Sequence, residues 1–326
     1  MTLPSSISTA TTKKAEDRKI FLIIDFHTHA FPDELAERAV SSLLATLHNA
    51  NSDLSFSHSA PLPSCPSAVQ ANYRTIGCRL SLPDSGFPEV MYTDGTAKGI
   101  INSMDKAGVD ISVLLPVATK PTQPKGINSW ARSFAEKEPR IIPFGAVFPD
   151  ETAEAQLEEL AERGYKGIKL HGDFQGFYAD DEKMLPIYRR CAEYGLICVM
   201  HAGLDCVSPN DIHVTPERMA RVLDKVSGMK FVLAHMGGNC IEDRAAKILA
   251  GADDVWVDTA YAAGRIAPEK MAELVGKYGA DRVLFASDSP WNDPADDIAL
   301  IRSTPISEGD REKIFYKNAQ ALLGLQ

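Results

Sequence analysis

The segment FLIIDFHTH at residues 21–29 joins an apolar run to two histidines that stand two positions apart. Further short apolar runs follow along the chain, separated by longer amphipathic stretches. Runs this short and this apolar are typical of strands that are buried on both faces of a parallel sheet. They read ISVLLPV (111–117), IIPFGAVF (141–148), GIKLH (167–171), LICVMH (196–201), KFVLAH (230–235), VWVDTA (255–260) and VLFAS (283–287).

Helices are expected between these runs. Gly195 is placed to end one helix, and Thr215 with Pro216 is placed to begin another as N-cap and first residue. Strands that alternate with helices in this way predict an α/β fold of the (β/α)8 TIM barrel type. An open doubly wound sheet is the alternative, but no G-x-G-x-x-G follows the first strand. The expected helices cover 151–163, 181–194, a stretch opening at 215–217, 268–278 and 310–323.

The chain has 326 residues, 44% of them hydrophobic and 24% charged, which suits one barrel domain over residues 19–326. Residues 1–18 are polar and are expected to form a flexible arm. Residues 48–95 are rich in Ser, Pro, Asn and Gly, so they predict an insertion after the first strand, either a lid or a variable surface loop.

The formal net charge of −10 and the absence of a Lys/Arg run argue against a nucleic-acid or membrane-surface partner. The N-terminus has no apolar core of a secretory signal, and no stretch approaches the length of a membrane span. We therefore expect a cytoplasmic protein that acts on a small molecule. The sequence allows a homo-oligomer without requiring one.

Polar side chains gather where the predicted strands end. A lone histidine there is more often a hydrogen-bonded core residue than a ligand, but four of the eight strands end in histidine and a fifth runs into an aspartate. The carboxyl ends of barrel strands carry the active site. Imidazole and carboxylate together suit Zn²⁺ and similar ions, so we predict one or two divalent ions per chain. The polar residues at the strand ends are His27, His29, His171, His201, His235 and Asp288.

Six short motifs, taken in order, resemble those of the amidohydrolase superfamily. The resemblance is closest to its group of metal-dependent hydrolases and aromatic-acid decarboxylases similar to aminocarboxymuconate-semialdehyde decarboxylase, and it runs from about residue 23 to residue 325. These motifs are specific for the superfamily and weak guides to the substrate. They are DFHTH (25–29), GIKLH (167–171), MHAG (200–203), AHMGG (234–238), SDSPW (287–291) and KNAQALLGL (317–325).

The resemblance implies a role for each of these residues. His27 and His29 would hold the more buried metal together with Asp288, and His201 would be a further ligand. His235 would bind a second metal, or would act on the substrate or the water in an enzyme with one metal. Asp288 would also take the proton of the metal-bound water as general base.

Lys169 bears on the number of metals. GIKLHGDFQG is similar to the segment of ureases in which a carboxylated lysine bridges two metals and the neighbouring histidine binds the substrate carbonyl. By that resemblance Lys169 is a bridging ligand and His171 a substrate contact. The alternative is a barrel-interior lysine whose ammonium pairs with Asp25.

Three further residues are candidate substrate contacts. Asp205 and His213 lie on the loop after 196–201, where they could equally cap or solvate the loop. Trp291 follows Asp288 closely and is expected to wall the pocket, with ordinary packing as the competing interpretation.

The leading functional prediction is hydrolysis of a small amide, lactone or ester by metal-bound hydroxide, with His171 or His235 stabilising the oxyanion. The alternative is non-oxidative decarboxylation of an aromatic or enol-type carboxylic acid, in which Arg74, Arg79 or Arg265 would orient the carboxylate. A barrel that has lost catalysis and serves as a scaffold is a third hypothesis, disfavoured by the full set of metal-binding residues.

Overall fold

The computed structural model describes residues 22–52, 91–205, 207–208 and 210–325. The predicted arm at 1–18 and most of the predicted insertion at 48–95 lie outside these residues, as do Arg74 and Arg79. The part of the insertion that is described includes the end of a long helix, α1 (Asp33–Ser52).

The described strands are all parallel and follow the predicted runs closely. The strands are β1 (Ile24–Thr28), β2 (Ile111–Leu114), β3 (Ile141–Pro143), β4 (Gly145–Ala146), β5 (Gly167–Leu170), β6 (Ile197–Met200), β7 (Lys230–Leu233), β8 (Val255–Asp258) and β9 (Val283–Leu284).

The strands pair in the orders β1-β2-β3 and β4-β5-β6-β7-β8-β9. β3 and β4 are two parts of one predicted strand, separated at Phe144, whose N–H still donates to the carbonyl of Leu114 (2.9 Å). On the other side, the N–H of Phe26 donates to the carbonyl of Phe285 (2.9 Å), and the N–H of Asp288 donates to the carbonyl of His27 (2.9 Å). These bonds link the first and last strands, and the predicted (β/α)8 barrel is confirmed.

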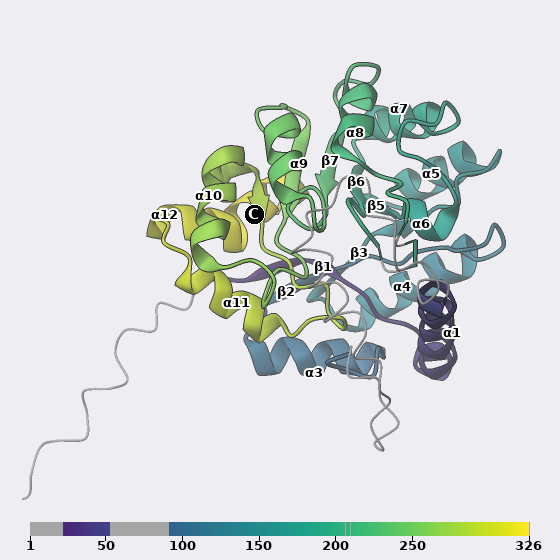
Figure 1. Ribbon diagram of the computed structural model, residues 1–326. Helices are drawn as coiled ribbons and strands as arrows, with labels where there is room; N and C mark the ends of the chain where they lie inside the picture. The colour runs from purple at the N-terminus through teal and green to yellow at the C-terminus, as the bar shows by residue number, and fades with distance from the viewer. Residues whose placement is uncertain (1–21, 53–90, 206, 209, 326) are drawn as a thin grey trace, which may run out of the picture.

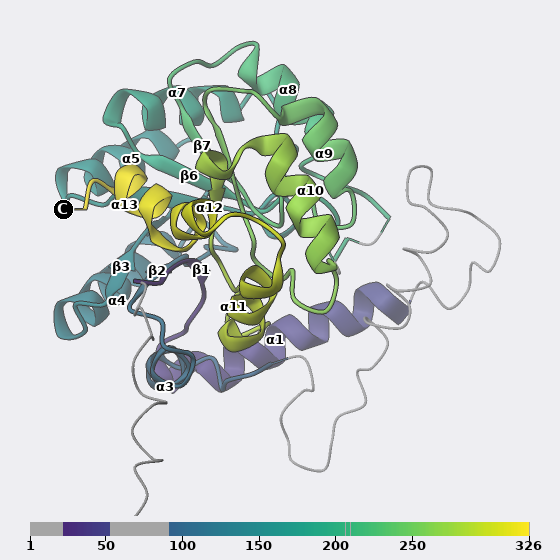
Figure 2. The ribbon, with the colours of Figure 1, turned by 90° about the vertical axis from the view of Figure 1, so that its left-hand side faces the viewer.

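Helices surround the strands on all sides (Figure 2). α1 lies outside this ring with one end beside α3, and the C-terminal helix α13 packs across one end (Figures 1 and 2). None of the described helices is both long and apolar enough to cross a lipid bilayer. Besides α1, the helices are α3 (Ala97–Ala107), α4 (Pro124–Lys137), α5 (Ala153–Glu162), α6 (Gly172–Gln175), α7 (Met184–Tyr194), α8 (Pro216–Leu223), α9 (Glu242–Leu249), α10 (Pro268–Tyr278), α11 (Pro294–Ser303), α12 (Glu308–Glu312) and α13 (Asn318–Leu323), with a 3-10 turn η2 (Ala280–Arg282) and a π-helical turn η3 (Lys313–Lys317).

The predicted helix signals hold at two places. The hydroxyl of Thr215 accepts the N–H of Arg218 (3.2 Å) and caps α8, and Gly195 ends α7 with φ +66°. The predicted helix at 310–323 is instead three consecutive pieces, because η3 interrupts it.

The strands are buried on both faces, as predicted. In β6, Cys198 and Met200 belong to the apolar cluster that includes the surrounding helices, whereas Ile197 and Val199 belong to a second cluster with Val232. Burial on both faces explains why these runs carry no alternation of polar and apolar residues.

Gly203, in the segment after β6, provides a test of stability. Its φ is +86°, and a Cβ atom there would lie 2.1 Å from the backbone nitrogen of Asn239. Because backbone strain and a backbone clash add, we expect Gly203→Ala to lower the free energy of unfolding by more than about 3 kcal/mol. Urea unfolding would measure this change in the free energy of unfolding.

Gly176→Ala is the matched control for this substitution. Gly176 also has a positive φ, +66°, but a Cβ atom there would meet nothing within 4 Å. Its cost should be about 1 kcal/mol, from backbone strain alone. Equal losses in the two variants would contradict the steric argument.

Candidate metal centre

His27 and His29 at the end of β1 meet Asp288, which follows β9. The Oδ1 atom of Asp288 lies 3.4 Å from Nε2 of His27 and 3.1 Å from Nε2 of His29, and the two Nε2 atoms are 3.1 Å apart. One ligand atom from each residue lies within 4.8 Å of the others. We call these three residues the first cluster. Their donor atoms point at one small volume, as a metal site requires.

The opposite ring nitrogens are held by acceptors. Nδ1 of His27 lies 2.9 Å from a carboxylate oxygen of Asp258, and Nδ1 of His29 lies 2.7 Å from the carbonyl of Leu115. A carbonyl can only accept, so Nδ1 of His29 carries its hydrogen and Nε2 keeps a free lone pair. Such partners fix the tautomer and orientation of histidine ligands in metal sites.

The ionisation states also suit a cation. Burial lowers the pKa of His27 well below its ordinary value, and the Lys169 charge adds to the shift. Burial works to raise the pKa of Asp288, but His27 and His29 outweigh it and hold that pKa below its ordinary value. Neutral imidazoles and an ionised carboxylate are the forms that bind metal. The first cluster therefore fits a divalent ion.

Lys169 lies inside the barrel, 1% exposed, with Nζ 3.1 Å from Nε2 of His27. Burial lowers its pKa to about 8. The alternative partner, Asp25, is held by the hydroxyl of Ser287 (2.5 Å) and by the backbone N–H groups of His27 and Ser287. Lys169 thus contacts a candidate metal ligand, and its function as a bridging ligand stays a prediction.

A second group of polar residues lies beside the first cluster. The rings of His171 and His201 are nearly parallel, with centroids 4.2 Å apart, and one ligand atom from each lies within 4.8 Å of one from Asp173. Asp205 places Oδ2 3.4 Å from Nε2 of His171 and 3.5 Å from Nε2 of His201. We call His171, Asp173 and His201 the second cluster.

His235 stands between the two clusters. Its Nε2 is 3.1 Å from Nδ1 of His201, its ring centroid is 5.6 Å from that of His27, and its Nδ1 is 3.0 Å from the carbonyl of Ala260. His235 and Asp288 both have positive φ, 59° and 66°. Non-glycine residues in this conformation are strained and cluster at functional sites.

The structure brings two of the three predicted substrate contacts to the site. Asp205 touches the second cluster directly, and His213 places Nδ1 2.9 Å from Asp173. Trp291 is connected through its backbone, whose N–H donates to the carbonyl of Asp288 (2.8 Å).

One residue of the site, Asp173, was missed as a candidate in the sequence. Asp173 stands two residues after His171, and this spacing is the signal that could have identified it. Asp258 ends β8 and faces the barrel interior, fully buried. Its role as the partner of His27 depends on the pairing of distant strands.

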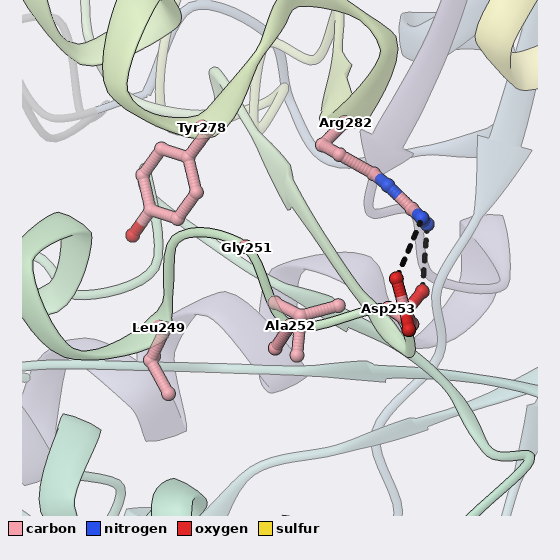
Figure 3. Close-up of a pocket in the computed structure, with 7 residues that line it drawn as sticks. Leu249, Gly251, Ala252, Asp253, Tyr278 and Arg282 are labelled. Carbon is pink, nitrogen blue, oxygen red and sulfur yellow. Dashed lines mark hydrogen bonds and ion pairs between the residues drawn. The ribbon is translucent and has the colours of Figure 1, made fainter.

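Cavities lie at both ends of the barrel. The one in Figure 3, about 120 Å³, is lined by Tyr278, Arg282 and the segment before β8, so it lies at the amino ends of the strands, away from the histidines. Arg282 spans it to bond the carbonyl of Asp253 (2.7 Å). A hollow of about 830 Å³ is lined by residues that follow β8 and β9, among them Arg265 and Asn292. None of the histidines of the two clusters lines this hollow.

Asp258→Asn tests the support of the metal centre. An amide would place an NH₂ group or a weaker acceptor opposite Nδ1 of His27 and favour the tautomer with hydrogen on Nε2, which cannot bind metal. We expect roughly a 10- to 100-fold loss of metal affinity, measured by titration of the metal-free protein. Asp254→Asn, on the surface just before β8, is the control. Equal affinities of both variants would contradict the assignment.

Comparison with known proteins gives concordant results. A family model described as amidohydrolase matches residues 24–325. Gamma-resorcylate decarboxylase of Polaromonas sp. is 24% identical over 245 residues, which cover 61% of this chain and 75% of that protein. The structure of 5-carboxyvanillate decarboxylase from Novosphingobium aromaticivorans, with manganese and a nitrobenzoic acid, has a TM-score of 0.65 at 18% identity and covers 94% of this chain and 96% of that chain.

A third similar protein is the dihydroxybenzoic acid decarboxylase of Polaromonas sp., solved with manganese and 2-nitroresorcinol. It has a TM-score of 0.62 at 18% identity, covering 94% of this chain and 97% of that chain. The structural likenesses establish the fold. The leading prediction of hydrolysis is wrong, since these three similar proteins are decarboxylases. The motifs indicate the family and the candidate metal-binding residues, and they leave open which bond is broken.

Proposed function

The chain belongs to the amidohydrolase family, and from this premise we propose that it is a metal-dependent decarboxylase of a hydroxylated aromatic carboxylic acid. The observation that carries the proposal is the buried first cluster in a chain whose curated relative is a decarboxylase of this chemical class. The partner is then a small anion, for which the enzyme needs neither nucleic acid nor a membrane surface.

His27, His29 and Asp288 would hold the divalent ion, which supplies positive charge to bind the oxygens of the substrate and to stabilise negative charge that develops on it. Two imidazoles and one carboxylate accept Zn²⁺ and Mn²⁺ alike. We keep zinc as a candidate beside manganese, which the two similar structures contain. His201, His235 and Lys169 remain proposed further ligands.

Decarboxylation breaks the bond between the ring carbon and the carboxylate, and a proton takes its place while CO₂ leaves. We assign movement of that proton to Asp288, with His235 beside it. The carboxylate of Asp288 is ionised at neutral pH, so it can accept a proton from a substrate hydroxyl and return it to the ring carbon. Its position beside His27 and His29 would place it next to a substrate that binds at the metal.

Arg265 is the proposed cation that orients the substrate. Its guanidinium carbon lies 3.1 Å from the centroid of the Tyr261 ring, and that ring lies 6.4 Å from the ring of His235. Arg265 also lines the large hollow near the carboxyl ends of the strands. The other proposed substrate contacts remain His171, Asp205, His213 and Trp291.

The test is release of CO₂ from a panel of mono- and dihydroxybenzoic acids by protein loaded with Mn²⁺ or Zn²⁺. We expect a phenolic product and CO₂ in equal amounts. Benzoic acid without a hydroxyl is the control and should be inert, because it offers no hydroxyl proton to Asp288. No CO₂ from any hydroxylated acid with either metal would overturn the proposal.

Arg265→Met should raise the KM for the substrate by roughly 10-fold or more with a smaller change in kcat, because a charge-assisted contact to a carboxylate is lost. Steady-state kinetics on the best acid of the panel would measure it. Arg302→Met, on the exposed side of α11, is the control. An unchanged KM in Arg265→Met would remove Arg265 from the proposed site.

A further inference from the structure

We propose that Asp297, a buried acid on α11, is a positioning residue that holds Arg265 in place for the substrate. The inference rests on the proposed function, because it concerns the cation that orients the carboxylic acid. Asp297 acts in this assignment through the loop at 259–267, which connects β8 to α10 and carries Arg265.

Asp297 is fully buried, and both oxygens of its carboxyl accept hydrogen bonds from loops at the mouth of the barrel. Oδ1 accepts the backbone N–H of Ala263 (2.9 Å), and Oδ2 accepts the side-chain amide of Asn292 (2.7 Å). Ala263 belongs to the loop after β8, and Asn292 belongs to the segment after β9. α11 itself lies beside α10 (Figures 1 and 2). One carboxyl therefore joins the loops that follow two neighbouring strands.

Ala263 connects the carboxyl of Asp297 with the guanidinium of Arg265. Its N–H donates to Asp297, and its carbonyl accepts from Nη1 of Arg265 (3.4 Å). Nη1 also donates to the carbonyl of Tyr261 (3.2 Å), and the guanidinium carbon lies over the ring of Tyr261. A shift of the backbone at Ala263 would therefore displace the guanidinium from this position.

Other bonds of this loop join it to itself. The N–H groups of Arg265 and Ile266 both donate to the carbonyl of Ala262, at 3.0 Å each. Tyr261 has a positive φ of 62°, and a strained backbone conformation of this kind persists only where the surroundings hold it. The bond between Ala263 and the carboxyl on α11 supplies such a hold from a different element.

The chemistry of the buried acid also points to a role for its two hydrogen bonds. Burial raises the pKa of Asp297 well above its ordinary value, and the bonds from Ala263 and Asn292 act against that shift. A buried polar group destabilises a fold unless it is hydrogen-bonded, so packing alone would be served better by an apolar side chain.

Asp288 is held by separate contacts. Its N–H donates to the carbonyl of His27 (2.9 Å), and its carboxylate lies beside His27 and His29. Loss of the Asp297 carboxyl should therefore weaken substrate binding through Arg265 and leave proton transfer by Asp288 in place.

The experiment measures KM and kcat of Asp297→Ala on the best acid of the panel, alone and combined with Arg265→Met. We expect Asp297→Ala to raise KM by roughly 5- to 10-fold, with kcat within about 3-fold of that of the parent protein. In the Arg265→Met background it should change KM by less than about 2-fold, because a residue that acts through Arg265 has nothing left to position. Asp297→Asn should keep the KM of the parent, because an amide oxygen still accepts from Ala263.

Thr304→Val is the matched control for a loss of stability. Thr304 is buried at the end of α11, and its hydroxyl donates to the carbonyl of Leu300 (2.8 Å) in the same helix. This variant should have a lower melting temperature and the KM of the parent. Asp297→Leu, a branched side chain without an acceptor, should raise KM as Asp297→Ala does, and it replaces the alanine variant if that variant does not fold.

A second readout needs no turnover. The Nε–H group of Arg265 gives a signal in proton–nitrogen NMR spectra, assigned by its absence in Arg265→Met, and the ring of Tyr261 shifts that signal. Asp297→Ala should move the signal by more than its line width, whereas Thr304→Val should leave it in place.

Additive changes of KM in the double variant, or an unmoved Arg265 signal in Asp297→Ala, would overturn the inference. So would an equal rise of KM in Thr304→Val, because a general loss of stability would then explain the effect. The outcome is separable from the proposed reaction. If the parent protein releases no CO₂, the proposed reaction fails and the NMR signal decides the role of Asp297. If CO₂ is released and Asp297→Ala keeps the KM of the parent, the positioning role alone fails.

Discussion

Asp288→Asn should reduce kcat/KM for decarboxylation by at least about 10³-fold, or roughly 4 kcal/mol of transition-state stabilisation. Asp288 contacts both His27 and His29 through one oxygen, and its carboxylate is ionised at neutral pH. An amide at this position loses the negative charge that attracts the metal and the group that moves the proton. CO₂ release under saturating metal would measure the loss.

Asp224→Asn is the control for this prediction, because its carboxylate is exposed at the end of α8 and does not line the large hollow. It should retain the activity of the parent protein. Activity of Asp288→Asn within 10-fold of that of the parent would contradict both assigned roles of Asp288. Loss of activity in Asp288→Asn at full metal content would show that metal binding is intact and that proton transfer is the role that was lost.

Removal of metal with a chelator should reduce activity by roughly 10²-fold or more, and Mn²⁺ or Zn²⁺ should restore it. Mg²⁺ and Ca²⁺ should restore much less, because imidazole nitrogens suit transition ions and hard cations prefer oxygen. Rates with each ion, added singly to the metal-free protein, would also decide between zinc and manganese.

Thermal unfolding gives a readout of metal binding that does not depend on turnover. A metal at 100 times its dissociation constant stabilises the folded state by about 2.7 kcal/mol, so the melting temperature should fall on chelation and recover with metal. Full activity of the chelated protein, with its metal content verified as zero, would contradict a metal-dependent reaction.

The fold could be predicted from the sequence in most of its parts. Apolar runs without alternation predicted strands buried on both faces, and their placement at 24–28, 111–114, 167–170, 197–200, 230–233 and 255–258 is confirmed. Local signals such as Thr215 and Gly195 marked helix ends correctly. Strand burial and capping depend on residues that are close in sequence, which is why these features could be read from it. The interruption at Phe144 and the π-helical turn at 313–317 were not predicted, because they depend on packing against neighbours.

The family also followed from the sequence, but the reaction did not, and the function of the candidate metal ligands stays a prediction. His27, His29 and Asp288 converge as expected, since residues at the ends of barrel strands share one face of the barrel. The preference for hydrolysis was wrong because the motifs identify candidate metal-binding residues and not the substrate bond that is broken. The choice between them depends on how the substrate is held, and that is set by loops around the mouth.

The sequence by itself determined the positions of most strands, the barrel class and which side chains could bind metal, because hydrophobic pattern and strand-end position are local properties. Only the tertiary structure decided which of those side chains lie together and which residues contact them. It paired Asp258 with His27 across the barrel, brought Asp173 to His171 and His201, and placed Lys169 against His27 rather than Asp25. These contacts join residues that are far apart in the chain, and their distances are fixed by the closure and twist of the barrel, which no short sequence pattern encodes.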